Sequence, residues 1–316
     1  MKDVTNTLRH SIIARKKLMK IRFAVTPPTC ALDEINYPHY LEECENLGFD
    51  TIWLSDIPLG GTGDPLLSLC FAAAHTTRLK LGANLVPLGR HPLWFAKQLA
   101  QLDRLSKGRL LVSFVPGLGS PAERAALGYS DKNRSKAIDE MIELMRRWWA
   151  SESVTAAWEN LSFDEATVQP TPLQKPLEVW LGGASQAALE RVAKISDGWL
   201  TSAITPLEAA ESKMKILKRA TELGRTVDNE HFGISMPFSV EAPDQLMSDA
   251  LRKRRKDGDL SEIIAVGEAG LRSLVDGHLN AGLSKFVMRP VDNTSTDFSW
   301  RDNLRWLADI VLPLQT

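Results

Sequence analysis

The strongest constraint on the fold of this chain is a regular alternation of short apolar runs with helical patterns. Eight apolar runs occur at residues 21–25, 51–54, 79–86, 109–115, 179–181, 198–200, 232–238 and 285–288. Helical patterns follow them at residues 37–47, 66–75, 91–105, 136–150, 186–195, 205–223, 269–281 and 303–312. Strands that are apolar on both faces are typical of parallel sheets covered by helices.

Several helical patterns carry their own start and stop signals. Asp64 precedes Pro65 as an N-cap, and Thr205 with Glu208 forms a capping box. Gly48 suits a left-handed C-cap. Each signal falls at the edge of a periodic segment, so we expect these helices to begin and end there.

Eight strand–helix units close naturally into an α/β fold, the (β/α)8 TIM barrel with insertions. An open doubly wound sheet is the rival, and a Gly-x-Gly-x-x-Gly turn after the first strand would favour it. That strand instead meets Thr26-Pro27-Pro28-Thr29, so we predict a barrel domain over residues 19–316. Two stretches, 116–135 and 239–266, exceed ordinary loop length. The second holds a basic run at 252–256, either a solvated helix face or an anion clamp.

Composition excludes some classes of protein. The 316 residues are 44% hydrophobic with a net charge of −1, so the chain is globular and we expect no nucleic-acid partner. No apolar run is long enough to span a membrane. Cys30, Cys44 and Cys70 lack paired spacing, which favours reduced thiols and a cytoplasmic location. Residues 1–18 are basic, and we expect an N-terminal extension outside the barrel, disordered or loosely docked.

In a barrel, chemistry lies at the carboxyl ends of the strands. These ends are polar but poor in titrating groups, with no metal-ligand spacing, so we expect no metal and a cofactor that carries the reaction. The candidate residues there are Thr26, Pro27, Ser55, Asp56, Asn84, Leu85, Pro116, Gly117, Gly182, Gly183, Ala184, Ser185, Thr201, Pro237 and Arg289.

One strand end carries a signal for phosphate. Gly182 and Gly183 follow the run at 179–181, and Ser185 can cap the helix that begins next. Free amides at a helix N-terminus attract a phosphate group. Because Gly-Gly is also a common turn between a strand and a helix, the plain turn stays an equal alternative.

Other strand-end residues also have two interpretations. Asp56 can orient a substrate or the edge of a flavin, or it can serve a turn. Arg289 can hold an anionic tail or form a surface salt bridge. Asn84 can contact a cofactor or simply end a strand. We interpret His91 mainly as the start of a helix and Trp53 mainly as a core residue.

Several segments together resemble the luciferase-like monooxygenases, the flavin- and F420-dependent oxidoreductases of the bacterial luciferase superfamily. They are GFDTIWLSD at 48–56, RLKLG at 78–82, HP at 91–92, the run at 96–109, VWLGG at 179–183 and DGW at 197–199. They occur in family order and cover roughly residues 21–290. Asp103 and Arg109 match family positions that we expect to serve the barrel.

The resemblance implies a barrel that binds reduced FMN or the deazaflavin F420. Its phosphate would lie near Gly183 and Ser185, and a bulge at the third strand, often with a non-proline cis peptide, would place Asn84 and Leu85 behind the ring. Gly182, Ala184, Gly117 and Arg289 complete the expected cofactor site, and Asp56 is the catalytic candidate. A small-molecule substrate, a flavin reductase and a homodimer partner are implied as well.

Two departures bear on the choice of cofactor. F420-dependent alcohol dehydrogenases of the family carry a His after the second-strand Ser-Asp, where this chain has Ile57. The acid expected beyond the Gly-x-Gly of the fourth strand is replaced by Ser120 and Pro121. However, residues 23–28 and 114–119 resemble an F420-dependent subgroup, so both cofactors stay open.

The sequence therefore favours a monooxygenase that uses reduced FMN and O2 on a small organic substrate. Hydride transfer with F420 is the first alternative, and a flavin-binding protein without turnover is the second. An unrelated phosphate-binding barrel such as an aldolase would need a Lys or Glu at a strand end, and none is well placed.

Overall fold

Eight parallel strands close into a ring in the computed structural model of the chain, which describes residues 19–117, 120–129, 134–158, 161–242, 249, 252, 259–291 and 299–316. The strands are β1 (Arg22–Val25), β2 (Thr51–Ser55), β3 (Lys80–Leu85), β4 (Leu110–Phe114), β7 (Val179–Leu181), β8 (Gly198–Ser202), β9 (Phe232–Ser239) and β11 (Lys285–Pro290). Each pairs with the next, β8 pairs with β9, and β11 returns to β1. This closure confirms the predicted barrel.

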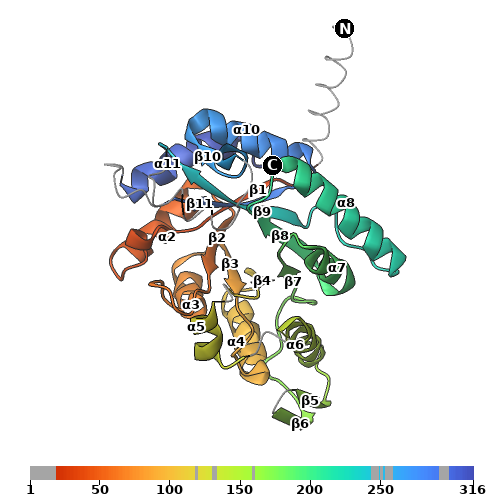
Figure 1. The fold of residues 1–316 in the computed structure, drawn as a ribbon. Coiled ribbons are helices and arrows are strands. Elements are labelled where there is room, and N and C mark those ends of the chain that lie inside the picture. The colour runs from red at the N-terminus through yellow and green to blue at the C-terminus, as the bar shows by residue number, and fades with distance from the viewer. Residues whose placement is uncertain are drawn as a thin grey trace.

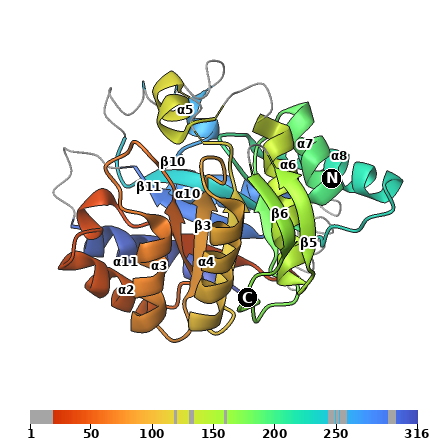
Figure 2. The ribbon, with the colours of Figure 1, turned by 90° about the horizontal axis from the view of Figure 1, so that it is seen from below.

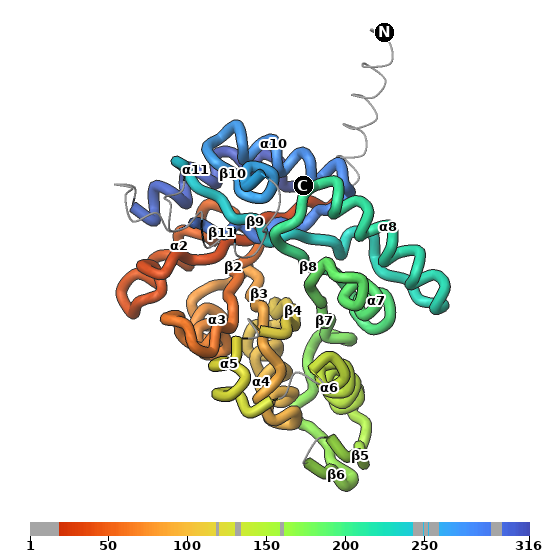
Figure 3. The backbone as a smooth tube through the Cα atoms, in the orientation of Figure 1, coloured from red at the N-terminus to blue at the C-terminus, as the bar shows by residue number. Residues whose placement is uncertain are grey.

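Helices lie around the outside of the strands (Figure 1), and the tube in Figure 3 follows the same path. They are α2 (Asn36–Leu47), α3 (Pro65–His75), α4 (Pro92–Leu105), α5 (Pro121–Leu127), α6 (Arg134–Trp149), α7 (Gln186–Ile195), α8 (Pro206–Glu222), α10 (Gly267–Asn280) and α11 (Trp300–Val311). Short 3-10 turns occupy η1 (Thr29–Ala31), η3 (Leu260–Glu262) and η4 (Leu312–Leu314). Each of the eight expected helices is present, with ends shifted by up to three residues.

The expected caps hold the helix ends. The Asp64 carboxylate accepts hydrogen bonds from the first backbone N–H groups of α3. Thr205 and Glu208 form the capping box of α8, with bonds of 3.2 and 2.7 Å. Gly48 ends α2 with φ of 96°, the left-handed region that favours glycine.

The sequence did not predict one helix and three strands. An antiparallel hairpin, β5 (Val154–Trp158) with β6 (Leu161–Ala166), is inserted between α6 and β7. The short helix α5 lies within the long stretch after β4, and β10 (Ala265–Val266) pairs with the end of β9. Figure 2 shows the hairpin along the side of the barrel and α5 at one of its ends.

Two indoles fill the barrel interior. Trp53 and Trp180 point inward from β2 and β7, together with Ala24, Leu200 and Val287 on other strands. A Cβ on Gly82 would lie 2.1 Å from the Trp53 ring, and one on Gly198 would lie 2.4 Å from the Trp180 ring. Small residues therefore sit where the large rings need space, and the prediction that Trp53 belongs to the core is confirmed.

The amino ends of the strands are closed by charged groups and by the last residues of the chain. Arg22 and Lys80 both pair with Asp50, at 3.1 and 3.6 Å. Burial lowers the pKa of Lys285 to about 8. The Thr316 hydroxyl accepts from the Ile21 N–H at 3.0 Å, which ties the C-terminus to this end. The chain's own side chains and its C-terminus thus occupy the amino ends, in keeping with a site at the carboxyl ends of the strands.

Some expectations fall outside the described residues. These are the extension at 1–18 and residues 253–256 of the basic run.

Of the three cysteines, Cys44 is buried, Cys70 is partly buried and Cys30 is exposed. No helix in the described part of the chain combines the length and apolarity that a membrane crossing requires.

Candidate active site at the carboxyl ends of the strands

A cavity of about 420 Å³ opens where the carboxyl ends of the strands meet. All eight barrel strands, or the residues just after them, contribute to its wall. The wall includes Thr26, Pro27, Leu54, Ser55, Asp56, Asn84, Val115, Gly117, Gly182, Gly183, Leu200, Thr201, Ser202, Ser235, Arg289 and Pro290. We call this space the mouth cavity.

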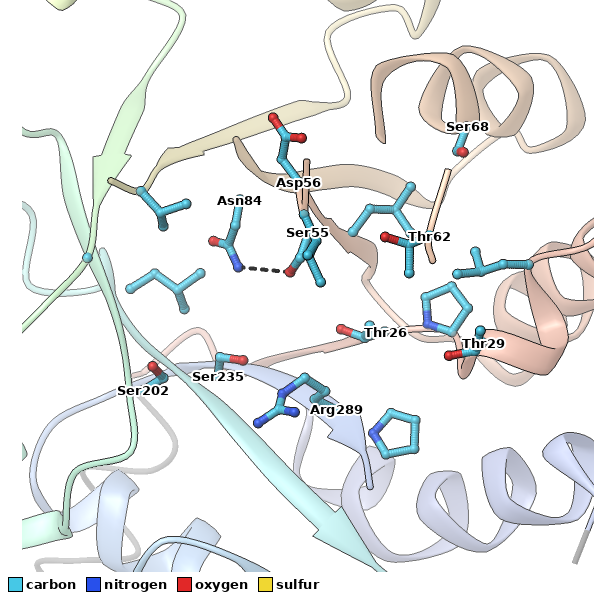
Figure 4. A pocket seen from close by; sticks show the side chains of 18 of the residues that line it. Thr26, Thr29, Ser55, Asp56, Thr62, Ser68, Asn84, Ser202, Ser235 and Arg289 are labelled. Carbon is cyan, nitrogen blue, oxygen red and sulfur yellow. Dashed lines mark hydrogen bonds between the residues drawn. The ribbon is translucent and has the colours of Figure 1, made fainter. Parts of the chain in front are cut away.

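The wall of the mouth cavity combines polar and apolar groups and holds few charges. Asn84 donates a hydrogen bond to the Ser55 hydroxyl at 3.4 Å, and both point into the cavity (Figure 4). Thr201 contributes a buried hydroxyl that has no partner within the described part of the chain. Among the described lining residues, Asp56 and Arg289 are the only charged ones, and none is a Lys, His or Cys. The wall can hold and orient a molecule, but it offers few groups that exchange a proton near neutral pH.

Asp56 is held in place by two hydrogen bonds to its carboxylate. Its Oδ2 atom accepts from the Val86 N–H at 3.1 Å and from the Arg90 guanidinium at 2.8 Å. The Asp56 side chain is only 8% exposed. In Figure 4 its carboxylate points away from the Asn84–Ser55 pair. The catalytic candidate therefore also joins the ends of β2 and β3.

The turn after β7 depends on its two glycines. A Cβ on Gly182 would lie 2.8 Å from the Leu200 carbonyl oxygen of β8. Gly183 has a φ of +94°, and a Cβ there would lie 2.9 Å from the Ala188 side chain. Ser185 caps α7, because its hydroxyl accepts from the Ala188 N–H at 3.3 Å. The chain is thus brought tightly from β7 into the N-terminus of α7, as predicted.

Arg289 enters the mouth cavity from β11, on the side opposite Asp56 (Figure 4). It lies in register with Pro237 of β9. The same face of β9 contributes Ser235, and β8 contributes Ser202. Sequence reasoning did not single out these two serines. Side chains alternate between the two faces of a strand, so counting in steps of two from Gly233 and from Leu200 would have placed Ser235 and Ser202 on the inner face.

Three expected cofactor residues lie outside the mouth cavity. Leu85 is fully buried in the outer core between the strands and helices, while Ala184 and Ser185 are exposed at the start of α7. The expected bulge at the end of β3 is absent, since Asn84 and Leu85 pair regularly with Ser113 and Phe114 of β4. The described cis peptide bonds both precede prolines, so the Asn84–Leu85 bond is trans. Regular pairing turns Leu85 outward, which corrects the expectation of a bulge with a cis peptide there.

Asp103 and Arg109 serve the barrel, as expected. The buried Asp103 carboxylate accepts from the Leu173 and Gln174 N–H groups at 2.7 and 3.0 Å. Arg109 donates to carbonyl oxygens of α3 and of the loop that follows this helix.

His91 is the N-cap residue of α4, which confirms that it starts a helix. The described residues hold no group of three or more His, Cys, Asp or Glu side chains placed to bind a metal ion.

Comparison with known sequences identifies similar proteins. The family model described as luciferase-like monooxygenase matches residues 36–280. An FMNH2-dependent dimethylsulfone monooxygenase from Pseudomonas fluorescens (strain Pf0-1) is 33% identical over 132 residues, which are 41% of this chain and 36% of that protein. A limonene 1,2-monooxygenase from Rhodococcus erythropolis is 28% identical over 257 residues, 77% of this chain and 66% of that protein. The chain thus spans about a third of the first relative and just under two thirds of the second.

Solved structures share the fold. A monooxygenase from Streptomyces bottropensis superposes with a TM-score of 0.76 at 21% identity, covering 93% of this chain and 99% of the other. The coenzyme F420-dependent tetrahydromethanopterin reductase from Methanopyrus kandleri gives a TM-score of 0.74 at 18% identity, covering 94% and 100%. At such identities the likeness concerns the barrel.

Proposed function

Because the chain belongs to the luciferase-like monooxygenase family, we propose that it binds reduced FMN at the mouth cavity and inserts one oxygen atom of O2 into a small organic substrate. The observation that carries this proposal is the chemistry of the wall. Its two charged described residues are Asp56, which is already held by Arg90 and Val86, and Arg289. With so few groups to transfer protons, the cofactor would supply the reactivity.

The residues at the mouth fit a phosphorylated flavin. Gly182 and Gly183 leave space that a Cβ would fill, and α7 presents its N-terminus beside them. Ser185, whose oxygen accepts from Ala188, keeps its hydroxyl hydrogen for a phosphate oxygen. Asn84 and Ser55 would face the ring from the barrel floor, and Arg289 would neutralise anionic charge at the wall. Reduced FMN, when bound, supplies the electrons that activate O2.

Two features favour FMN over F420. Ile57 stands where F420-dependent alcohol dehydrogenases of the family carry a His. Both relatives described above are named monooxygenases, and one name specifies FMNH2. Their named substrates, dimethylsulfone and limonene, are small uncharged molecules, which supports a substrate of that kind here. F420-dependent hydride transfer is the second candidate, favoured by the resemblance of residues 23–28 and 114–119 to an F420-dependent subgroup.

The proposal includes two partners. A flavin reductase would deliver reduced FMN, because none of the described residues in the wall of the mouth could reduce the cofactor. A second copy of the chain would form a homodimer, for which the uncharged surface of α3 is the candidate interface.

Titration with both cofactors tests the proposal. We expect FMN to bind with a dissociation constant at least about tenfold below that of F420. Reduced FMN on the protein should then react with oxygenated buffer, and 18O from labelled O2 should enter an added organic substrate. Tight F420 binding without FMN binding would contradict monooxygenation and support hydride transfer. FMN binding without turnover on any substrate would indicate a flavin-binding protein.

A further inference from the structure

A second cavity of about 340 Å³ adjoins the mouth cavity on the side of α5. Asp56, Ile57, Thr62 and Gly63 line both cavities. One layer of side chains at most therefore separates them. We call the second space the side cavity.

The wall of the side cavity is apolar on one side. Ile57, Val86 and Leu88 come from the ends of β2 and β3, and Leu127 comes from α5. The helix α5 is seated closely here, since a Cβ on Gly89 would lie 2.8 Å from the Leu127 carbonyl oxygen. Val86 and Leu88 are each only 1% exposed, so this side of the wall offers a ligand a small apolar contact surface.

The other side of the wall carries three charges. The Arg90 guanidinium lies 2.8 Å from Asp56 and 3.5 Å from Asp64, and it donates to the Val86 carbonyl oxygen at 3.2 Å. It also stacks over the Phe95 ring at 5.2 Å. One cation is therefore matched by two carboxylates, and the cluster carries one net negative charge. This net negative charge would repel an anionic ligand, and none of these groups is a free cation that could pair with it.

Hydrogen-bonding capacity is left over at the same place. Both bonds to the Asp56 carboxylate fall on Oδ2, and a carboxylate can accept several hydrogen bonds. The Thr62 hydroxyl is shielded from solvent and has no partner within the described residues. A ligand hydroxyl would satisfy both, because it can donate a hydrogen bond to Asp56 and accept one from Thr62.

We propose that the side cavity is the substrate compartment, and that it selects uncharged molecules that carry one hydrogen-bond donor for Asp56. This inference rests on the proposed function, because it assumes a cofactor in the mouth cavity. It assigns Asp56 a role in substrate selection: its carboxylate accepts the hydrogen bond of the substrate and repels anions. No proton transfer is required of it.

Binding of two matched probes tests the compartment. Cyclohexanol and cyclohexanecarboxylate share a ring and differ in charge, and calorimetry or saturation-transfer NMR can follow each with the full chain. We expect cyclohexanol to bind at least about tenfold more tightly than the carboxylate at neutral pH. Asp56→Asn should reduce this preference several-fold, because it removes one of the two carboxylates around Arg90.

A filled cavity gives the second test. Leu127→Trp should weaken cyclohexanol binding about tenfold or more and leave FMN affinity within about twofold. Ala126→Trp, which adds the same ring to an exposed position of α5, should change neither. Equal binding of the two probes by the wild-type chain, or unchanged cyclohexanol binding in Leu127→Trp, would overturn the inference. If FMN does not bind the wild-type chain, the proposed function is wrong. The preference of the side cavity for cyclohexanol over cyclohexanecarboxylate is decided separately, by the two probe measurements.

Discussion

His278 is an imidazole that water cannot reach. It lies in the last turn of α10, only 1% exposed, and its Nδ1 has no hydrogen-bond partner in the described part of the chain. Burial lowers its pKa from 6.5 to about 4. Above pH 6.5 the group is neutral in the folded and the unfolded chain, so it does not affect the pH dependence of stability. Between pH 6.5 and 4 only the unfolded chain binds the proton, so stability falls as the pH falls.

We therefore expect His278→Leu to be less sensitive to acid than the wild-type chain. The free energy of unfolding of the wild-type chain should lose up to about 1.4 kcal/mol more than that of the variant for each pH unit within this window. Urea denaturation at several pH values measures the difference. His39→Leu, at an exposed position of α2, is the control and should follow the wild-type chain. Parallel curves for wild type and His278→Leu would contradict this account.

Single residues also mark the limits of prediction from sequence. Asp56 was found because it follows a strand, and strand ends meet at the mouth of a barrel. Its partner Arg90 lies 34 residues later, and only the folded chain brings the two together. Leu85 was placed in the site by the family resemblance, yet regular alternation along β3 turns it outward.

At the scale of elements, the N-terminus of α7 gives the sharpest test of the phosphate site. Ser185 has a cap role that is visible in the structure and a phosphate role that is proposed. Ser185→Ala should destabilise the chain by about 1 kcal/mol through the lost cap. It should also weaken FMN binding by about 1–2 kcal/mol, the scale of a hydrogen bond to a charged group. Thermal denaturation and FMN titration measure the two effects separately.

Ser185→Asp separates the two roles. Aspartate caps a helix as well as serine does, so the stability should stay close to that of the wild-type chain. Its negative charge would repel a phosphate, so FMN should bind even more weakly than in Ser185→Ala. Riboflavin, which lacks the phosphate, should bind all three chains equally. If FMN binds the aspartate variant as tightly as the wild type, the phosphate lies elsewhere.

Elements differ in how well the sequence predicts them. The barrel strands and their helices follow from apolar runs and caps, because local patterns and tertiary burial agree there. The hairpin β5–β6 was missed because VTAAW and LSFDEA contain Ala, Asp and Glu, which are uncommon in strands. Tertiary contacts hold it instead: Phe163 packs against Trp148 of α6 at 5.1 Å, and the Trp148 indole donates to the Ala166 carbonyl oxygen.

At the scale of the whole molecule, one face is unlike an ordinary protein surface. The helix α3 reads PLLSLCFAAAH and contains no Asp, Glu, Lys or Arg. Leu67 on α3 is 73% exposed, and Trp94 on the neighbouring helix α4 is 59% exposed. A groove of about 510 Å³ between these helices is lined by both residues and by Cys70 and Leu102, and its wall also contains the charged residues Asp64, Arg90 and Lys97. Apolar surfaces of this kind mark sites of association.

The helix α3 suits a two-fold contact with a second copy of itself, because it would bury no Asp, Glu, Lys or Arg side chain of its own. We therefore expect the chain to form a dimer through α3. Leu67→Glu should raise the dissociation constant at least tenfold, since burial of one leucine contributes about 1.5–3 kcal/mol and the glutamates would face each other across the axis. Sedimentation over a range of concentrations measures it. Leu207→Glu is the matched control, because Leu207 is 70% exposed on α8, across the barrel from α3 (Figure 1). A dimer that Leu207→Glu breaks and Leu67→Glu leaves intact would move the interface to α8, and a wild-type monomer would remove it.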